Sequence, residues 1–448
     1  MLLEILNTID SFIWGLPLIV LLVGTGIWLT VRLKLIQVFR LFLAMKLIVS
    51  SENKGNGDVN AFKVLCIALA ATVGTGNIVG VATAVKTGGP GALFWMWIAA
   101  FFGMATKYAE CMLAVKYREI DSNGNISGGP MYYIKNGMGE KWKWLATMFA
   151  IFGMLSGILG IGTMTQVNTI ADIVNIGMGF DPMFVNFVVT FCAGIIIFGG
   201  IRFISNAASM IVPFMAIAYF ISTVVLLLIN ADKVPAAFAS IISDAFTGTA
   251  MTGGFLGSSV MLAMRSGIAR GIFSNESGLG SAPIVAAAAK TNYPAEQGLV
   301  SMTGTFFDTI IICTLTGLSL VVTDVWSGSL KGVGMTNSAF LSVYPDWGTY
   351  ILMISLSLFA FSSIIGWSYY SERCAVYLFG TKSIFYFRLA WVSAVGFAAF
   401  LQLEEIWCLA DICNGLMAFP NLVGVLSLSP VVIKETKEYF KYLENCEK

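Results

Sequence analysis

The chain has 448 residues, of which 57% are hydrophobic and only 11% charged, and its formal net charge is +1. A soluble domain carries about 25% charged residues, so this composition excludes a soluble protein and predicts a polytopic membrane protein in a lipid bilayer. The absence of histidine excludes His-ligated metals and His-based catalytic pairs, and the net charge argues against nucleic acid as a partner.

Apolar segments of about 20 residues, long enough to cross a ~30 Å hydrocarbon layer, recur along the whole chain. We predict eleven transmembrane helices, near residues 12–30, 62–85, 92–115, 144–171, 183–199, 205–228, 259–289, 299–323, 350–370, 384–401 and 406–428. The amphipathic stretch LIQVFRLFLAMKLI, between the first two, is expected to lie along the membrane surface. GGPMYYIKNGMG, residues 128–139, is expected to form a shorter surface piece.

The distribution of Lys and Arg predicts the orientation of these helices. Of the 26 basic residues in the chain, 21 fall in or beside loops on one side of the predicted membrane and five on the other, which accounts for all 26. Cytoplasmic loops carry the excess of Lys and Arg. We therefore expect a multi-pass protein of the cell membrane, with its N-terminus outside and its C-terminus in the cytoplasm.

The second predicted span contains glycine and polar residues at its centre. In LAATVGTGNIVGVATAV, residues 69–85, Thr75 and Asn77 stand among Gly74, Gly76 and Gly80. Glycine costs roughly 1 kcal/mol relative to alanine inside a helix, and irregular backbone at membrane depth occurs only where it lines a cavity or is buried in protein. The stretch indicates either a broken helix at a binding site or, through the GxxxG pair Gly76 and Gly80, close helix packing.

A second stretch of this kind, GIFSNESGLGSAP (residues 271–283), lies in the seventh span. Its Glu276 would cost roughly 3 kcal/mol at a helix centre. Gly76 and Gly278 are 202 positions apart, close to half the chain, and paired interruptions in two halves indicate a transporter binding site. Five spans followed by five more imply a second half inserted with inverted orientation. The predicted parts are an extra helix (1–35), a cytoplasmic connector (36–60), a first repeat (61–230), an extracellular connector (231–258), a second repeat (259–430) and a cytoplasmic tail (431–448).

Three motifs resemble the alanine or glycine:cation symporter family, which includes sodium:alanine symporters, of the amino acid-polyamine-organocation superfamily. They are GGPGALFWMWIAAFFG (88–103), GGPMYYI (128–134) and IIGWSYYSER (364–373). The resemblance implies an all-α LeuT-type fold, with a five-plus-five inverted repeat and one extra N-terminal helix. It also implies sodium- or proton-driven uptake of alanine or glycine.

The first interruption also resembles the unwound helix of neurotransmitter:sodium symporters, whose GLGN corresponds to residues 74–77. That similarity implies that amides near Thr75 and Gly76 bind the substrate carboxylate, and it gives Phe273 and Ser274 matching positions in the second interruption. The expected substrate-binding set is Thr75, Gly76, Asn77, Gln166, Phe273, Ser274, Asn275, Gly278 and Trp367. The expected sodium ligands are the carbonyls of Ala70 and Val73 and the hydroxyls of Ser362 and Ser363.

Several of these residues have a structural alternative. The two serines could bond back to their own helix, Gln166 could be an interhelical hydrogen bonder, and Trp367 could belong to an interfacial belt. Three further charged residues, Asp308, Lys107 and Glu110, are expected to be structural pairs or charges at loop edges.

The predicted function is sodium-coupled symport of small neutral amino acids, with no enzyme activity and no cofactor apart from sodium as coupling ion. The alternative is a proton-coupled amino acid symporter of the same fold. The predicted span 205–228 has no Lys or Arg that could replace a cation, which favours sodium, whereas a buried Glu276 would allow a proton. A membrane enzyme lacks a candidate nucleophile–base pair here, and a channel would show a repeated filter loop rather than paired interrupted helices.

Overall fold

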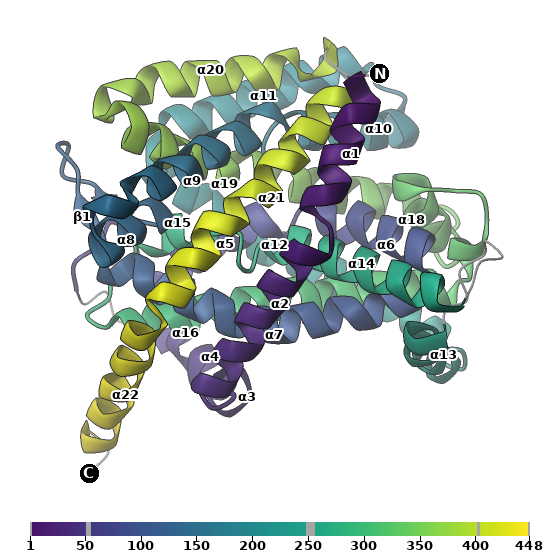
Figure 1. Ribbon diagram of the computed structural model, residues 1–448. Helices are drawn as coiled ribbons and strands as arrows, with labels where there is room; N and C mark the ends of the chain where they lie inside the picture. Colours follow the sequence, from purple (N-terminus) through teal and green to yellow (C-terminus); the bar gives the residue numbers. More distant parts are fainter. Residues whose placement is uncertain (1, 51–54, 248–255, 401–403, 447–448) are drawn as a thin grey trace.

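The computed structural model describes residues 2–50, 55–247, 256–400 and 404–446, and these are predominantly helical (Figure 1). The described strands are β1 (Glu119–Ile120) and β2 (Ile126–Ser127), an antiparallel hairpin in which Glu119 pairs with Ser127. Asp121 closes its turn by accepting hydrogen bonds from the amides of Asn123 and Asn125. The fold is therefore a helical bundle, to which the hairpin is a small addition.

The chain begins with α1 (Leu2–Ile13) and α2 (Leu16–Arg32), which follow one another with a short interruption. Pro17 lies in the first turn of α2, where its missing N–H costs nothing. α1 packs along α21, and α2 packs against α7 (Figure 1). The predicted surface stretch forms α3 (Ile36–Phe39) and α4 (Leu41–Ser50).

The next part of the chain contains the interrupted helix and four further predicted spans. Its helices are α5 (Ala61–Thr72), the π-helical segment Gly76–Gly80, α6 (Val81–Gly88), α7 (Gly91–Lys116), α8 (Pro130–Tyr133), the π-helical segment Ile134–Met138, the 3-10 turn Glu140–Trp142, α9 (Lys143–Ser156), the π-helical segment Gly157–Ile161, α10 (Met164–Met178), α11 (Pro182–Phe198) and α12 (Gly200–Ile229). Polar side chains begin two of them: Asn60 caps α5, and Asp181 caps α11 immediately before a proline.

The remaining helices carry the second interruption. They are α13 (Val234–Thr247), α14 (Leu256–Asn275), α15 (Ala282–Ala286), α16 (Pro294–Thr305), the π-helical segment Phe306–Cys313, α17 (Thr314–Val322), the 3-10 turn Val325–Ser327, α18 (Gly332–Leu341), α19 (Gly348–Phe379), the 3-10 turn Thr381–Ser383, α20 (Ile384–Phe397), the 3-10 turn Ala398–Phe400, α21 (Glu404–Ser427) and α22 (Ser429–Cys446). The predicted connector 231–258 contains α13, and part of it lies outside the described residues. The α19 helix is largely buried and packs against α5, α9, α10 and α12, so it runs through the centre of the bundle.

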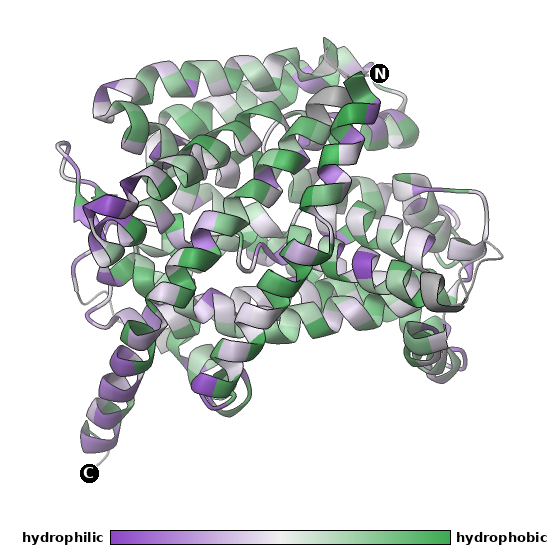
Figure 2. Cartoon of the chain, in the orientation of Figure 1, coloured by the Kyte–Doolittle hydropathy of each residue, from purple (hydrophilic) through white to green (hydrophobic). Residues whose placement is uncertain are grey.

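Hydropathy follows this arrangement. Apolar residues cover most of the helices, whereas hydrophilic residues gather on α22 and around the β1–β2 hairpin (Figure 2). Among the described residues, seven helices are long and apolar enough to cross a membrane, and an eighth is formed if the bent pair α5 and Gly76–Gly88 is one span. The other predicted spans correspond to α11, the α14–α15 pair and α20, which are short or interrupted. The prediction of a multi-pass helical membrane protein is confirmed. The lengths and hydropathies of the described helices do not confirm the predicted number of eleven transmembrane helices.

Candidate functional site

Both predicted helix interruptions are present. The first separates α5 from the segment Gly76–Gly88, and the two parts are bent by 52°. The amide of Gly74 donates a 2.8 Å hydrogen bond to Oδ1 of Asn77, so this side chain replaces part of the missing helical ladder. The second interruption separates α14 from α15, where Glu276, Gly278 and Gly280 all have positive φ angles.

The first interruption reaches a cavity of about 410 Å³. Of the nine predicted substrate-binding residues, Thr75, Gly76 and Phe273 line it. The lining residues are Leu3, Asn7, Asp10, Thr75, Gly76, Val79, Gly80, Thr83, Ile161, Thr165, Thr169, Arg270, Phe273, Cys408, Ala410 and Asp411. Residues of α1 and α10 therefore belong to a site that the sequence patterns placed mainly on the two interrupted helices.

The GxxxG pair Gly76 and Gly80 does not have the close contacts of a packing motif. A Cβ atom at Gly80 would have no heavy atom within 4 Å, so no helix packs closely there. A Cβ atom at Gly76 would lie 3.4 Å from Cδ1 of Phe273 and from Cα of Ser274. The open space at Gly80 argues against the GxxxG alternative and favours a broken helix that faces a cavity.

Asp308 connects the two interrupted helices. Its Oδ1 accepts a 2.7 Å hydrogen bond from Nδ2 of Asn77, which follows the first break. Its Oδ2 accepts hydrogen bonds from the hydroxyls of Ser274, at 2.9 Å, and Thr309, at 2.7 Å. Thr309 in turn accepts from the side-chain amide of Asn275 at 3.0 Å. Three predicted substrate residues, Asn77, Ser274 and Asn275, are thus held in a buried network around one carboxylate.

Asp308 is not the loop-edge charge that was one of the two expectations for it. Its side chain is instead fully buried, within the π-helical segment Phe306–Cys313 at the centre of a predicted span. Its position in the sequence could have identified it, because an ionisable residue inside an apolar span is a functional candidate by default. Lys107 and Glu110 are likewise buried and 3.9 Å apart, so they form a pair inside the bundle rather than at its edge.

The two predicted sodium-ligand serines lie on α19 opposite the end of α5. The hydroxyl of Ser362 is 3.2 Å from the carbonyl oxygen of Ala70, and that of Ser363 is 3.4 Å from the carbonyl oxygen of Ala71. Both hydroxyls also donate to the carbonyl of Phe359 on their own helix, so the structural alternative holds at the same time. The carbonyl of Val73 is not among the hydrogen-bond partners of either serine.

A glycine explains why α19 approaches α5 so closely. A Cβ atom at Gly366 would lie 2.8 Å from the amide nitrogen of Ala71, which no side chain tolerates. A Cβ atom at Gly74 would overlap the hydroxyl of Ser363. The contact between the serines and the carbonyls therefore depends on two positions without side chains.

The remaining predicted residues lie around the site but do not line the cavity. Gln166 donates from Nε2 to the carbonyl of Ile161 at 2.9 Å, while its buried Oε1 has no hydrogen-bond partner among the described residues. Trp367 is 1% exposed and packs against Gly162. The carbonyl of Gly278 accepts a 2.8 Å hydrogen bond from Asn421.

Two interrupted helices beside a cavity inside a polytopic helical bundle are the architecture of a secondary transporter. A solved structure of MhsT in complex with L-phenylalanine is similar to this chain, with a TM-score of 0.56 at 13% identity; it covers 83% of this chain and 89% of that one. At this identity the likeness shows the fold alone, and it confirms the predicted fold class.

The chain belongs to the sodium:alanine symporter family, because the sequence model of this family matches residues 1–448. It is 47% identical to the sodium/alanine symporter AgcS of Methanococcus maripaludis, over 99% of this chain and 98% of that protein. It is 54% identical to an uncharacterised transporter of Haemophilus influenzae, over 98% of this chain and 97% of that protein. The family is one of transporters, not of enzymes, and the predicted resemblance is confirmed.

Proposed function

We propose that this protein carries small neutral amino acids, alanine and glycine, into the cell together with sodium, by alternating access. The observation that carries the proposal is the first interrupted helix, which presents Thr75 and Gly76 to a cavity. Helix breaks expose amides that favour an anion. The substrate carboxylate would bind there, and the relative named sodium/alanine symporter supports alanine as the substrate.

The surroundings of Gly76 favour a small substrate. Phe273 and Ser274 lie within contact distance of the space above this glycine. A larger side chain placed beside Gly76 would have to move the ring of Phe273, which lines the cavity. We therefore expect glycine, alanine and serine to be carried, and leucine and phenylalanine to be rejected.

Sodium would bind where Ser362 and Ser363 face the end of α5. Hydroxyl and carbonyl oxygens suit a hard cation, and the carbonyls of Ala70 and Ala71 already lie beside the two hydroxyls. In the proposal a bound sodium ion takes over these oxygens, with the carbonyl of Val73 as a further ligand. The membrane orientation, with the N-terminus outside, and the two repeats at 61–230 and 259–430 are part of the same proposal.

Proton-coupled symport is the second candidate. The observation that favours it is Glu276, a carboxylate that is 2% exposed at the second interruption, where it accepts a hydrogen bond from the hydroxyl of Ser281. A buried carboxylate of this kind can exchange a proton during transport. The two candidates differ in the gradient that drives uptake.

Uptake of labelled alanine into proteoliposomes, with sodium, lithium and proton gradients imposed separately, tests both candidates. We expect the sodium gradient alone to drive concentrative uptake, which unlabelled glycine and serine inhibit and leucine does not. Uptake driven by a proton gradient without sodium would establish the second candidate. Displacement of alanine by leucine at equal affinity would contradict the expected preference for small substrates.

The sodium site has its own test. Ser362→Ala removes one predicted ligand and should raise the sodium concentration needed for half-maximal uptake. A lost charge-assisted contact is worth roughly 1.5–3 kcal/mol, which corresponds to about 10- to 150-fold. Ser368→Ala is the matched control, because this serine lies on the same helix and donates only to the carbonyl of Ile365 among the described residues. Unchanged sodium dependence in a folded Ser362→Ala protein would remove Ser362 from the site.

A further inference from the structure

A basic cavity lies where the turn between α2 and α3 meets the last helix, α22. Its volume is about 870 Å³, and it shares no lining residue with the cavity at the first break. Its walls come from the end of α2, from α3 and the residue after it, and from α22, which extends from the bundle as a hydrophilic helix (Figure 2). The proposed function does not use this cavity.

The charge of the basic cavity is strongly unbalanced. Its lining contains one acidic residue, Glu444, and five basic residues, which are Arg32, Lys34, Arg40, Lys437 and Lys441. The formal charge of the lining is therefore +4, whereas the whole chain carries +1. Like charges repel one another, so an anion placed among these side chains would stabilise the cluster.

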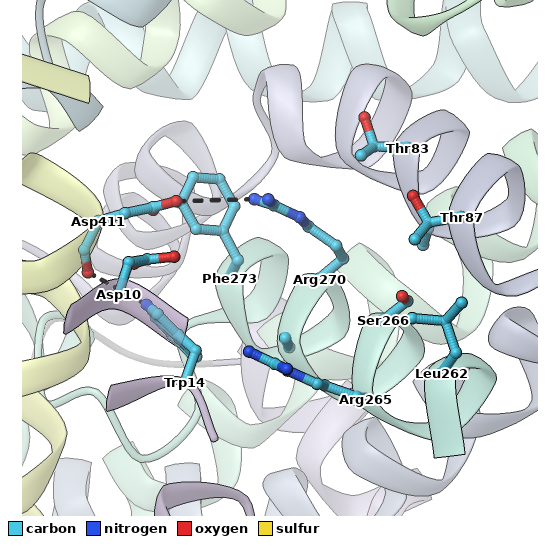
Figure 3. Close-up of a pocket in the computed structure, with 12 residues that line it drawn as sticks. Asp10, Trp14, Thr83, Thr87, Leu262, Arg265, Ser266, Arg270, Phe273 and Asp411 are labelled. Atoms are coloured by element: carbon cyan, nitrogen blue, oxygen red, sulfur yellow. Dashed lines mark hydrogen bonds and ion pairs between the residues drawn. The ribbon is translucent and has the colours of Figure 1, made fainter. Parts of the chain in front are cut away.

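The charged groups beside the first break are arranged differently. Two acidic and two basic side chains line one cavity there, Asp10, Asp411, Arg265 and Arg270, and Arg270 faces Asp411 at 3.9 Å (Figure 3). Their formal charges cancel within the protein. In the basic cavity, by contrast, none of the five cationic side chains has an ion pair or a side-chain hydrogen bond with another described residue. Their positive charge therefore remains for a ligand.

Aromatic rings position the two arginines of the basic cavity. The guanidinium of Arg40 lies over the ring of Phe440, 4.3 Å from its centroid, and that of Arg32 lies over Trp28 at 5.3 Å. A cation over an aromatic ring is attracted to the π face without using its N–H groups in hydrogen bonds to oxygen. The guanidinium can therefore still donate to an anion, and its planar pairs of N–H groups match the oxygens of a phosphate.

The basic cavity also adjoins apolar surface at the end of a predicted span. α2 is part of a helix that is long and apolar enough to cross a membrane and ends at Arg32. Phe39 lines the cavity and is 72% exposed, and Phe42, in the first turn of α4, is 84% exposed. Trp28 is exposed beside Arg32, as aromatic residues at the membrane–water interface are. A ligand held here can therefore place a charged group on the basic side chains and an apolar part against α2, α3 and α4.

We infer that the basic cavity binds the phosphate headgroup of an anionic phospholipid. The phosphate would bind Arg40, Lys437 and Lys441, and the acyl chains would lie against the exposed apolar side chains of α2, α3 and α4. Basic pockets beside membrane-spanning helices bind such headgroups. A free phosphate ion carries the same charged group, but it would fill only a small part of this volume and leave the apolar surface uncovered. The bound lipid would connect α22 with the turn between α2 and α3.

Lipid binding by the purified protein tests the inference. The full-length protein in dodecyl maltoside is titrated with phosphatidylglycerol or with phosphatidylcholine, and native mass spectrometry counts the lipids bound to each chain. We expect one phosphatidylglycerol, bound about tenfold more tightly than phosphatidylcholine. Arg40→Gln and Lys437→Gln should each weaken its binding about fivefold, as expected for one basic residue near an anionic lipid. Glu444→Gln removes the acidic residue and should strengthen binding by a similar factor, which damage to the fold would not do.

Lys434→Gln is the matched control. It removes the same charge from the same helix, but Lys434 lies outside the cavity lining and 3.9 Å from Glu438. Equal binding of the two lipids, or an equal loss in Lys434→Gln and Arg40→Gln, would overturn the site, because general positive charge would then account for binding. Displacement of phosphatidylglycerol by equimolar inorganic phosphate would assign the cavity to a free anion and overturn the lipid. Melting temperatures show that each variant is folded, and no outcome depends on alanine or sodium, so the proposed function is tested separately.

Discussion

The two interrupted helices differ in what fills the break. At the first break, Thr75 and Gly76 face a cavity, and a Cβ atom at Gly80 would meet empty space. At the second break, the space is filled: Cβ atoms at Gly278 and Gly280 would lie 2.6 Å from Leu22 and 2.7 Å from Phe149. The same sequence signal, glycine and polar residues inside an apolar span, therefore marks a binding surface in one half and a packed junction in the other.

Polar side chains of three other helices, α7, α8 and α21, complete this junction. The side-chain amide of Asn421 donates to the carbonyl of Gly278 at 2.8 Å and to Oε2 of Glu110 at 2.9 Å. Its Oδ1 accepts from the hydroxyl of Tyr133. Backbone groups freed at membrane depth must find partners within the protein. The second break meets this requirement with side chains from other helices, whereas the first meets it in part through its own Asn77 and otherwise faces a cavity.

The largest expected effect is at the link between the two breaks. Asp308→Ala removes the acceptor of three buried donors, and each unsatisfied donor costs roughly 1–3 kcal/mol. We expect the unfolding free energy to fall by roughly 3–5 kcal/mol and alanine binding to be lost. Asp308→Asn keeps one acceptor oxygen and should lose less. Thermal melting of the purified variants measures this, and an Asp308→Ala protein that melts like the unaltered one would show that the breaks are held independently.

The next effect distinguishes the open break. Gly76→Ala places a methyl group where the substrate carboxylate would approach, yet the nearest atoms of Phe273 and Ser274 are at 3.4 Å and can accommodate it. We expect alanine affinity to fall by about 10- to 150-fold, the value of a hydrogen bond to a charged group, with a normal melting temperature. Lowered melting with retained affinity would instead establish a packing role for Gly76.

The filled break should respond in the opposite way. Gly280→Ala introduces a Cβ atom 2.7 Å from Cε2 of Phe149 and Cγ of Pro130, at a φ of +84° that favours glycine. Overpacking costs roughly 1–3 kcal/mol. We expect a lower melting temperature but an unchanged half-saturating alanine concentration for the protein that remains folded. A change in alanine affinity without a change in melting would place substrate at the second break too.

The smallest effect is expected at Gly80. Its φ of −64° is helical, and a Cβ atom there would meet nothing within 4 Å. Gly80→Ala should leave stability unchanged or raise it by up to ~1 kcal/mol through better helix propensity. Differential scanning fluorimetry beside Gly76→Ala measures the contrast between the two glycines. A clear loss of stability in Gly80→Ala would restore the GxxxG packing interpretation that the open space argues against.

The sequence by itself determined the membrane class, the family and the positions of both breaks, because each is a local property of composition, motif or glycine placement. It also identified Ser362 and Ser363 as residues that face α5, through the resemblance to related transporters. The structure places the carbonyls of Ala70 and Ala71 beside the two hydroxyls, and the roles of all four predicted ligands stay predictions.

Only the tertiary structure decided which break is open and which is filled. The residues that fill the second break, Leu22, Phe149 and Asn421, come from three different helices. The same holds for Asp308, whose partners lie 231 and 34 positions away, and for Asp10, which reaches the cavity at the first break from α1. Such contacts depend on how distant helices pack, and side-chain packing is not encoded in the spacing of one segment.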